Sequence, residues 1–410
     1  MCKHCNDVNH VEDDTVPGRR DVLKAGAALV AAPLMAGLGA NAQAATAQTP
    51  KAPSPGPYPT RAWGSRSAAA PLEPMAISRR ELGPHDVLVD VLYCGICHSD
   101  IHQAWNEWPS SFPTKYPCIP GHEIIGRVLA VGSAVTKFKV GDIGGVGCMV
   151  DSDGTCENCL ADREQNCLSG ATFTYNSPDA VSGGHTYGGY ADKLVVKEHF
   201  VIRIPPGADL AATAPLLCAG ITTFSPMQHW RLSAGQRVGV IGLGGLGHVA
   251  VKLAVARKAE VTVFTTSPGK RADAKRLGAR EAVLWSDTEA MKRLAGKLDL
   301  LISTVPDTYP MQPFMDVLKL DGTLINVGAL NQLEGLNGMA LAFGRKSLAG
   351  SVIGGIAETQ EVIDYCTARN IKADIELIRP DQINQAFDRV KKKDVRYRFV
   401  IDMASLKATT

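Results

Sequence analysis

The sequence predicts an α/β protein, in which a mostly β domain is followed by a domain with a doubly wound parallel sheet. Short apolar runs separated by Gly and Pro fill residues 61–204, a pattern typical of a mostly β domain. After Pro205-Pro206, strand-like and helix-like stretches alternate, as in "RVGVIGLGGLGHVAVKLAVARKAEVTVFTTS". This alternation predicts a parallel sheet with helices on both faces. The length of 410 residues allows two domains, each with a full core.

The composition excludes several classes of function. Hydrophobic residues make up 45% of the chain and charged residues 20%, and the net charge is +2. This is an ordinary globular balance, and so small a charge gives no footprint for nucleic acid or an acidic membrane surface. The 11 cysteines are an odd number and include CxxC-like clusters, which favours metal binding over a simple disulfide framework.

The first 60 residues have the pattern of an export signal followed by a linker. "GRRDVLKAGAALVAAPLMAGLGANAQA", from Gly18 to Ala44, combines paired arginines, a short apolar run and small residues suited to cleavage. We therefore expect a twin-arginine (Tat) signal peptide over residues 1–44 and a Pro-rich linker over residues 45–60. The apolar run is shorter than the roughly 20 residues of a membrane span, so no stable membrane insertion is expected. The expected location is the periplasm, or the cytoplasm if the signal is not used; a surface helix or a misplaced start codon are the alternatives.

A glycine motif predicts a dinucleotide site. Gly242, Gly244 and Gly247 form G-x-G-x-x-G directly after a strand-like run and at the start of a helix-like one. The first glycine allows the tight turn, the second lets the pyrophosphate approach the backbone, and the third allows close packing. The helix N-terminus then faces the phosphates. A glycine-rich turn without a ligand is the alternative.

The second strand of this unit favours NADP(H) over NAD(H). It ends in "FTTSPGKR", with no acidic residue for the ribose 2′-hydroxyl. Thr266 and Ser267 offer hydroxyl groups, and Lys270 and Arg271 offer positive charge, which suit a 2′-phosphate. For the two cations, a solvated helix start is the alternative.

Three separated segments provide ligands for a catalytic zinc. Cys97 lies in "CGICHSDIH", His122 in "PGHEIIG" and Cys218 in "PLLCAGIT". Two thiolates and an imidazole with a fourth position left open suit a catalytic zinc ion. Because a lone cysteine such as Cys218 is more often a small core residue, the interpretation depends on the whole set.

Together, "GICHSD", "GHE", "PLLCAG" and "GLGGLGH" resemble the zinc-dependent medium-chain alcohol dehydrogenases. "YCGICHSDIHQA", "GSVIGG" and "DVRYRFVID" resemble more narrowly the cinnamyl alcohol dehydrogenase-like branch with its bacterial broad-range aldehyde reductases. The resemblance runs from about Arg61 to the C-terminus. It implies a GroES-like catalytic domain over residues 61–217, an NADP-binding Rossmann domain over 218–352, a return to the catalytic domain over 353–410, and a homodimer.

The resemblance implies hydride transfer between NADP(H) and an aldehyde or primary alcohol, with zinc polarising the carbonyl. It assigns proton donation to Ser99, its resupply to His102, support of a ligand imidazole to Asp100, and an approach to zinc during ligand exchange to Glu123. For His102, an ordinary surface histidine is the alternative. Further cofactor contacts are expected at Gly245, Leu246, Thr222, Val327, Ser351 and Ile353. Trp105, Trp108 and Val352 are expected to line the substrate pocket, although the tryptophans could be core residues, and Val352 stands where plant members often have phenylalanine.

A second zinc ion is implied for a lobe at residues 148–167. The family pattern C-x2-C-x2-C-x7-C is met here by Asp153, Cys156, Cys159 and Cys167, so a carboxylate replaces the first thiolate. An aspartate is an acceptable zinc ligand. A lobe without metal, or substitution by a nearby cysteine such as Cys148, are the alternatives.

Two other functions fit the same motifs. One is an exported oxidoreductase whose tightly held nicotinamide is recycled by coupled oxidation and reduction. The other is a non-catalytic dinucleotide-binding protein, although a pure binder has no use for an open zinc or for Ser99.

Overall fold

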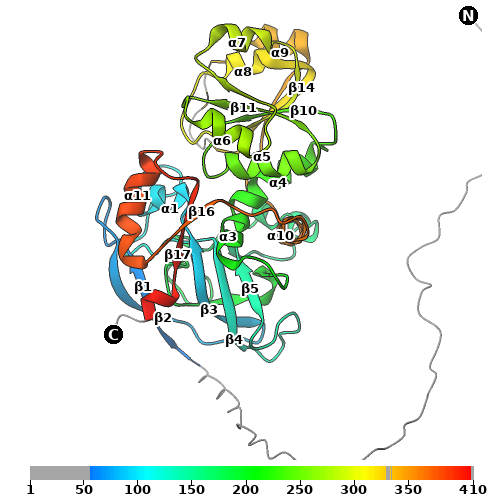
Figure 1. Ribbon diagram of the computed structural model, residues 1–410. Helices are drawn as coiled ribbons and strands as arrows, with labels where there is room; N and C mark the ends of the chain where they lie inside the picture. The colour runs from blue at the N-terminus through cyan, green and yellow to red at the C-terminus, as the bar shows by residue number, and fades with distance from the viewer. Residues whose placement is uncertain (1–55, 329–332, 334, 408–410) are drawn as a thin grey trace, which may run out of the picture. The chain divides into compact units, whose positions relative to one another are not determined.

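The computed structural model describes residues 56–328, 333 and 335–407 (Figure 1). The expected signal peptide and most of the linker lie outside the described residues. In the described part, strands form two large sheets and two small ones. The two large sheets correspond to the two domains expected from the sequence.

The first large sheet has seven strands. They are β3 (Asp86–Gly95), β4 (Ile124–Val131), β5 (Ile143–Val146), β8 (Lys193–Lys197), β9 (Val201–Arg203), β16 (Ile375–Ile378) and β17 (Arg398–Asp402). The order is β16-β17-β3-β4-β5-β9, and β8 also pairs with β3. All pairs are antiparallel except β16 with β17. The C-terminal strand β17 thus lies beside β3, as the red and blue strands in Figure 1 show.

The position of β3 explains its composition. Its sequence "DVLVDVLYCG" is rich in β-branched residues, which favour strands. Because β4, β8 and β17 all pair with it, Val87, Val89 and Val91 are fully buried. β3 ends at Gly95, and this places the following residues of the chain at the edge of the core.

The second large sheet is entirely parallel, which confirms the predicted α/β fold. Its six strands are β10 (Arg237–Ile241), β11 (Glu260–Thr265), β12 (Glu281–Leu284), β13 (Leu298–Ser303), β14 (Leu318–Asn326) and β15 (Ser347–Gly350). The order β12-β11-β10-β13-β14-β15 is that of a dinucleotide-binding sheet, with β10 as its first strand. The strand order reverses between β10 and β13, and ligands of such sheets bind in the crevice at this point.

The remaining elements are short strands and helices. The small sheets pair β1 (Tyr58–Gly64) with β2 (Glu73–Arg79), and β6 (Met149–Asp151) with β7 (Thr172–Phe173). The α-helices are α1 (His98–Ala104), α2 (Glu157–Leu160), α3 (Leu210–Thr213), α4 (Ala219–His229), α5 (Gly247–Ala256), α6 (Lys270–Arg276), α7 (Thr288–Arg293), α8 (Gln312–Val317), α9 (Gly338–Gly344), α10 (Ile356–Ala368), α11 (Ile383–Lys391) and α12 (Ala404–Lys407). The 3₁₀ helices are η1 (Glu164–Asn166), η2 (Glu198–Phe200), η3 (Ala214–Leu217) and η4 (Pro380–Gln382).

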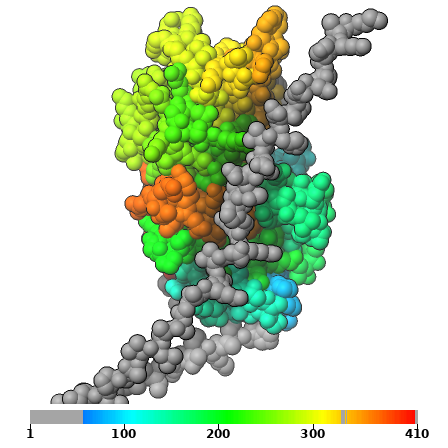
Figure 2. All heavy atoms as spheres, turned by 90° about the vertical axis from the view of Figure 1, so that its right-hand side faces the viewer, coloured from blue at the N-terminus to red at the C-terminus, as the bar shows by residue number. Residues whose placement is uncertain are grey.

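Two helices connect the sheets. α4 leads from the first sheet toward β10, and α10 follows β15; the two helices contact each other, and α10 also contacts β9. Figure 2 shows α10 in orange against the green atoms of the preceding segments. Across the described part of the chain, no single helix has the length and apolar character of a membrane span; only α3–η3 and α4 together, bent by 54°, reach that composition.

Candidate active site

A cleft of about 520 Å³ lies at the switch point of the parallel sheet and is lined by both domains. The parallel sheet contributes the glycine turn after β10 and residues 304–309 after β13. The first domain contributes residues 96–99 after β3 and residues 397–399 at β17. The cleft therefore joins the expected metal ligands to the expected dinucleotide site.

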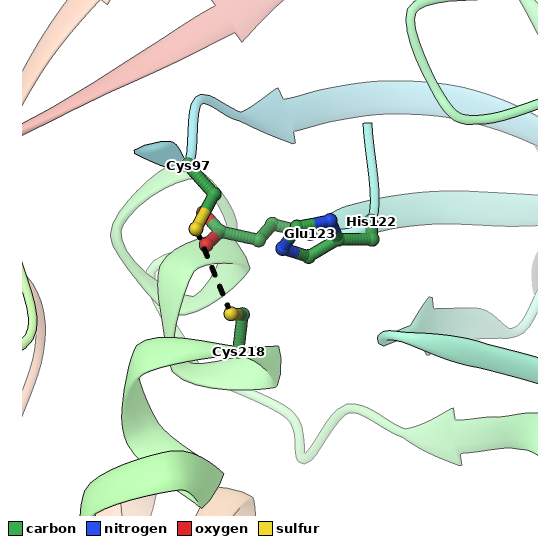
Figure 3. A group of neighbouring side chains, drawn as sticks. All are labelled: Cys97, His122, Glu123 and Cys218. Atoms are coloured by element: carbon green, nitrogen blue, oxygen red, sulfur yellow. Dashed lines mark hydrogen bonds between the residues drawn. The ribbon is translucent and has the colours of Figure 1, made fainter. Parts of the chain in front are cut away.

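Four buried side chains converge at one end of this cleft. They are Cys97, His122, Glu123 and Cys218, and each offers a ligand atom within 4.8 Å of the others. Figure 3 shows the four side chains pointing toward one another. Cys97 is the N-cap of α1, His122 and Glu123 directly precede β4, and Cys218 is the N-cap of α4.

The geometry of this group fits a tetrahedral zinc ion. The sulfur atoms of Cys97 and Cys218 are 3.9 Å apart. Two sulfurs at about 2.3 Å from a tetrahedral zinc lie about 3.8 Å from each other. Contact with Cys218 is the largest cause that holds the pKa of the Cys97 thiol well below its ordinary value, and a thiolate is the ligand form.

The imidazole of His122 supplies the third donor. Its Nδ1 faces the Tyr175 hydroxyl at 3.1 Å and Asp100 Oδ1 at 3.5 Å, whereas its Nε2 is buried without a hydrogen-bond partner among the described residues. A buried polar atom without a partner is costly unless something binds it. An Nδ1–H donor fixed by these neighbours leaves Nε2 as a metal ligand.

Asp100 positions both ligand loops. Its buried carboxylate accepts hydrogen bonds from the backbone N–H of Cys97 at 2.8 Å and of Gly121 at 3.0 Å. Tyr190 donates a third hydrogen bond, at 3.0 Å. The resemblance implied support for an imidazole, and the structure adds that the same side chain anchors the segments that carry Cys97 and His122.

Glu123 forms a buried ion pair with Arg398 of β17. One carboxylate oxygen binds the guanidinium, and the other, Oε2, has no partner in the described part of the chain. Burial raises the pKa of Glu123, and the positive charge of Arg398 opposes that change. A carboxylate oxygen of Glu123 belongs to the group of donor atoms around the metal position.

The residues expected to move protons lie on α1. Ser99 Oγ is 3.7 Å from Cys97 Sγ and lines the cleft. His102 also lines the cleft, and its ring lies 4.6 Å from the rings of both His98 and Trp108. Its Nδ1 is 2.6 Å from a carboxylate oxygen of Glu107, a partner that the sequence did not indicate.

The glycine turn has the geometry that its motif predicts. Gly242 has φ +91°, a conformation that other residues rarely adopt. A Cβ on Gly247 would lie 2.0 Å from the Gly242 carbonyl oxygen, whereas a Cβ on Gly244 would meet nothing within 4 Å. Gly242 and Gly244 to Leu246 line the cleft, and Gly247 supports the turn from behind.

Most of the other expected cofactor residues line the cleft, and two do not. Those that do are Thr222, Thr266, Ser267, Lys270, Val327 and Ile353. Arg271 is exposed and Ser351 is partly buried, and neither is among the lining residues. Lys270 donates a hydrogen bond to the Leu243 carbonyl at 2.8 Å, whereas Arg271, the next residue on α6, lies outside the cleft.

The apolar wall of the pocket corrects one expectation. Trp108 and Val352 line the cleft, but Trp105 does not. Trp105 instead packs edge-on against Phe387 with ring centres 6.0 Å apart, and Lys391 lies 4.2 Å from its ring centre. Helix α1 ends at Ala104, so the turn after it directs the two tryptophans to different surroundings.

The lobe brings its four expected ligands together. Asp153, Cys156, Cys159 and Cys167 each offer an atom within 4.8 Å of the others. Asp153 Oδ1 also accepts hydrogen bonds from the backbone N–H of Thr155 at 2.9 Å and of Cys156 at 3.0 Å. These donors hold the pKa of Asp153 far below its usual range, so that the carboxylate is charged. The donor set therefore fits a divalent metal with one oxygen and three sulfur ligands.

Cys148 lies in the main cleft, not with the lobe ligands. It lines the cleft and interacts with the thiol of Cys218, and its charge acts on His122. Substitution of Cys148 for Asp153 in the lobe is therefore contradicted. The lobe contacts the rest of the chain through Glu164. The buried carboxylate of this residue accepts a hydrogen bond from the backbone N–H of Ile356, at the start of α10, at 3.0 Å.

Three metal ligands that leave one coordination position open, next to a dinucleotide-binding crevice, are typical of a zinc-dependent dehydrogenase. The family described as "Alcohol dehydrogenase GroES-like domain" matches residues 83–206, and the family described as "Zinc-binding dehydrogenase" matches residues 245–368. The chain belongs to the medium-chain zinc-type alcohol dehydrogenase family, which confirms the resemblance at this level.

Relatives within the family are similar over nearly their whole length. "Aldehyde reductase YahK" of Escherichia coli is 50% identical over 348 residues, which cover 84% of this chain and 99% of the relative. "NADP-dependent alcohol dehydrogenase C 1" of Mycolicibacterium smegmatis is also 50% identical, over 85% of this chain and 99% of its own.

Solved structures agree with the fold. A cinnamyl alcohol dehydrogenase of Sorghum bicolor matches with a TM-score of 0.82 at 44% identity, over 85% of this chain and 98% of that one. The structure of "CAD from Helicobacter pylori complexed with NADP(H)" matches with a TM-score of 0.79 at 39% identity, over 85% of this chain and 99% of that one.

Proposed function

We propose that the protein is a zinc-dependent alcohol dehydrogenase that reduces aldehydes to primary alcohols with NADPH. The observation that carries this proposal is the convergence of two buried thiols and an imidazole nitrogen without a hydrogen-bond partner, beside Ser99 in the cleft that holds the glycine turn. When bound, zinc supplies Lewis-acid polarisation of the carbonyl, and reduced nicotinamide supplies the hydride. Close relatives are named as NADP-dependent alcohol dehydrogenases and as an aldehyde reductase, which supports the same reaction and cofactor.

The residues of the chain have separate tasks in this reaction. Cys97, His122 and Cys218 would hold the catalytic metal. Ser99 Oγ donates the proton that converts the carbonyl oxygen into a hydroxyl group. His102 has Nδ1 fixed by Glu107, so Nε2 is the ring nitrogen that can exchange protons with the cleft and resupply Ser99.

The pocket favours aldehydes with an apolar body. Trp108, Phe112, Tyr175 and Val352 present aromatic and aliphatic surface to the cleft. Such surface binds aromatic or straight-chain groups by burial from water.

The test compares Ser99→Ala with Ser99→Thr in the metal-loaded protein. We expect Ser99→Ala to lower kcat for aldehyde reduction by about 10²–10⁴-fold while the zinc content and NADPH affinity stay unchanged, because only proton donation is lost. Ser99→Thr retains the hydroxyl group and should retain most of the activity. Full activity of Ser99→Ala would exclude this residue as the proton donor.

The lobe would hold a second, structural zinc ion through Asp153 and the three cysteines. Its role is to stabilise the segment that carries Glu164 against the start of α10. Metal analysis of the purified protein should give two zinc ions per chain, and a value of one would remove this assignment.

We also propose a homodimer formed through the parallel sheet. Strand β15 lies at the edge of that sheet, and α9, which precedes it and contacts β14, has no buried residue (Figure 1). Phe343 on α9 is 82% exposed and Met339 is 68% exposed. A second copy would cover both this strand, which is at the sheet edge among the described residues, and these apolar side chains. Light scattering should give a dimer, and Phe343→Asp with Met339→Asp should give a monomer; an unchanged dimer would place the interface elsewhere.

We propose that residues 1–44 direct export by the twin-arginine machinery. Mass spectrometry of protein from the periplasm should show cleavage after Ala44, and the same fraction would show whether NADP(H) stays bound. Full-length protein confined to the cytoplasm would exclude export.

A further inference from the structure

Lys393 lines the cofactor cleft from the catalytic domain, directly before the "DVRYRFVID" segment and far in sequence from the glycine turn. It follows α11 and precedes β17, and its backbone N–H donates to the Val390 carbonyl at 2.9 Å. Val395, Tyr397 and Lys270 also line this cleft. In the part of the chain that the structure describes, no hydrogen bond or ion pair is found for the Lys393 ammonium group.

The surroundings of Lys393 carry more positive than negative charge. Burial lowers the pKa of Lys270, and the positive charges of Arg396 and Lys393 lower it further. Asp273 is the nearby acid, and it is already bound by Arg396 at 2.7 Å. Lys270 and Lys393 thus line the same cleft and their charges interact, while the acid that acts on Lys270, Asp273, is already paired with Arg396. Such an excess of positive charge is unfavourable unless an anion binds there.

The position of Lys270 indicates which anion this is. It follows the carboxyl end of β11 together with Thr266 and Ser267, where a dinucleotide-binding sheet receives the ribose 2′ position. The pyrophosphate, in contrast, belongs at the glycine turn and the N-terminus of α5. The charge of Lys393 acts on Lys270, so we expect Lys393 to lie near the ribose end of the bound cofactor.

We propose that Lys393 is a specificity-determining residue that binds the 2′-phosphate of NADP(H) from the catalytic domain, while Lys270 binds it from the dinucleotide domain. This inference rests on the proposed use of NADP(H). It replaces Arg271, which does not line the cleft, as the second cation for this phosphate. Because the two lysines belong to different domains, the 2′-phosphate also links the two walls of the cleft.

The backbone makes a clean test possible. Lys393 has φ +58° at the position after the C-cap of α11, where glycine is the preferred residue. Lys258 has φ +62° at the same position after α5, is exposed and does not line the cleft. Lys393→Gly and Lys258→Gly therefore remove the same side chain from the same helix-end conformation, and only one of them alters the cleft.

The experiment measures dissociation constants for NADPH and NADH by fluorescence, and thermal unfolding, on the full metal-loaded chain. We expect both variants to melt no lower than the parent, because glycine suits this conformation. Lys393→Gly should weaken NADPH about tenfold, as for the loss of one charge-assisted hydrogen bond, and NADH less than twofold. Lys258→Gly should change neither, and Lys393→Arg should retain the preference for NADPH.

Three results would overturn the inference. Unchanged NADPH affinity in Lys393→Gly would mean that the side chain does not reach the phosphate. An equal loss for both cofactors would place Lys393 at the pyrophosphate. If the parent protein bound NADH as tightly as NADPH, the cofactor assignment itself would fail, which is a different failure from that of Lys393 alone.

Discussion

Two alanine substitutions in the glycine turn should separate folding from cofactor binding. Gly244 has no positive φ, and a Cβ there meets nothing within 4 Å, so Gly244→Ala fits the folded protein. Gly247→Ala places a methyl group 2.0 Å from the backbone oxygen of Gly242 and 3.2 Å from Thr304 Oγ1. The first methyl group enters the cleft and the second enters the packed turn.

The magnitudes follow from these contacts. Gly244→Ala reduces the freedom of the unfolded chain and should raise the free energy of unfolding by about 0.4–1 kcal/mol. Gly247→Ala forces the backbone apart because a carbonyl oxygen cannot rotate away, and overpacking of this kind costs about 1–3 kcal/mol. The phosphates must approach the turn closely at Gly244, so the first substitution should weaken NADP(H) binding at least about tenfold.

The assay is urea unfolding of the metal-loaded protein, combined with calorimetric titration of NADP⁺. Gly244→Ala should be at least as stable as the parent and bind poorly, whereas Gly247→Ala should be less stable. Tight binding of NADP⁺ to a stable Gly244→Ala protein would refute the assignment of this turn to the phosphates. A neutral Gly247→Ala would show that the turn relaxes more easily than the 2.0 Å contact suggests.

Three further predictions concern the metal centres and the lobe. Cys218→Ser should remove one zinc ion per chain and abolish aldehyde reduction with little change in NADPH affinity; metal analysis with calorimetry tests it, and activity that survives metal removal would contradict it. Asp153→Cys should slow the loss of the lobe metal to a chelator, because thiolate is the softer ligand, whereas Asp153→Ala should accelerate it and lower the melting temperature. Glu164→Gln should lower the free energy of unfolding at pH 7 by about 1.5–3 kcal/mol, because charged hydrogen bonds to Ile356 and His199 are weakened. Burial raises the pKa of Glu164, but those hydrogen bonds outweigh it and leave the pKa below its unfolded value. Its contribution is therefore present above about pH 4.3 and lost as pH falls through the folded pKa, and a difference that persists at lower pH would indicate a purely steric effect.

The parts of the site that the sequence could predict are those encoded locally. Gly242 to Gly247 form a turn between a strand and a helix that are contiguous with it. Cys97, Ser99 and His102 share one segment at the end of β3, so their spacing alone brings them near one another. For such motifs, the local backbone geometry alone brings the residues together, and the fold places the whole motif at the cleft.

The parts that the sequence could not predict depend on distant pairing. Arg398 reaches Glu123 across 275 residues because β17 pairs with β3, and Lys393 reaches the cleft for the same reason. Arg271 and Trp105 show the opposite case. Proximity to a motif predicts a place in the site for each, but the direction of a side chain at a helix end depends on packing that no short segment encodes.

Distant pairing also bears on the proposed export of the protein. Cys97 and Cys218 are separated by 121 residues, so the catalytic ligand set exists only after both domains have folded. The dinucleotide cleft needs the C-terminal segment as well, because Asp374 links His248 on α5 to the backbone of Arg398. A chain exported unfolded would carry its thiols unprotected into an oxidising compartment, where they could form disulfides before the ligand sets assemble. Folding with metal bound before transport protects the same sulfurs as thiolates. The physical requirements of this site therefore favour folding before transport. The twin-arginine pattern, which is typical of proteins transported in the folded state, favours the same order.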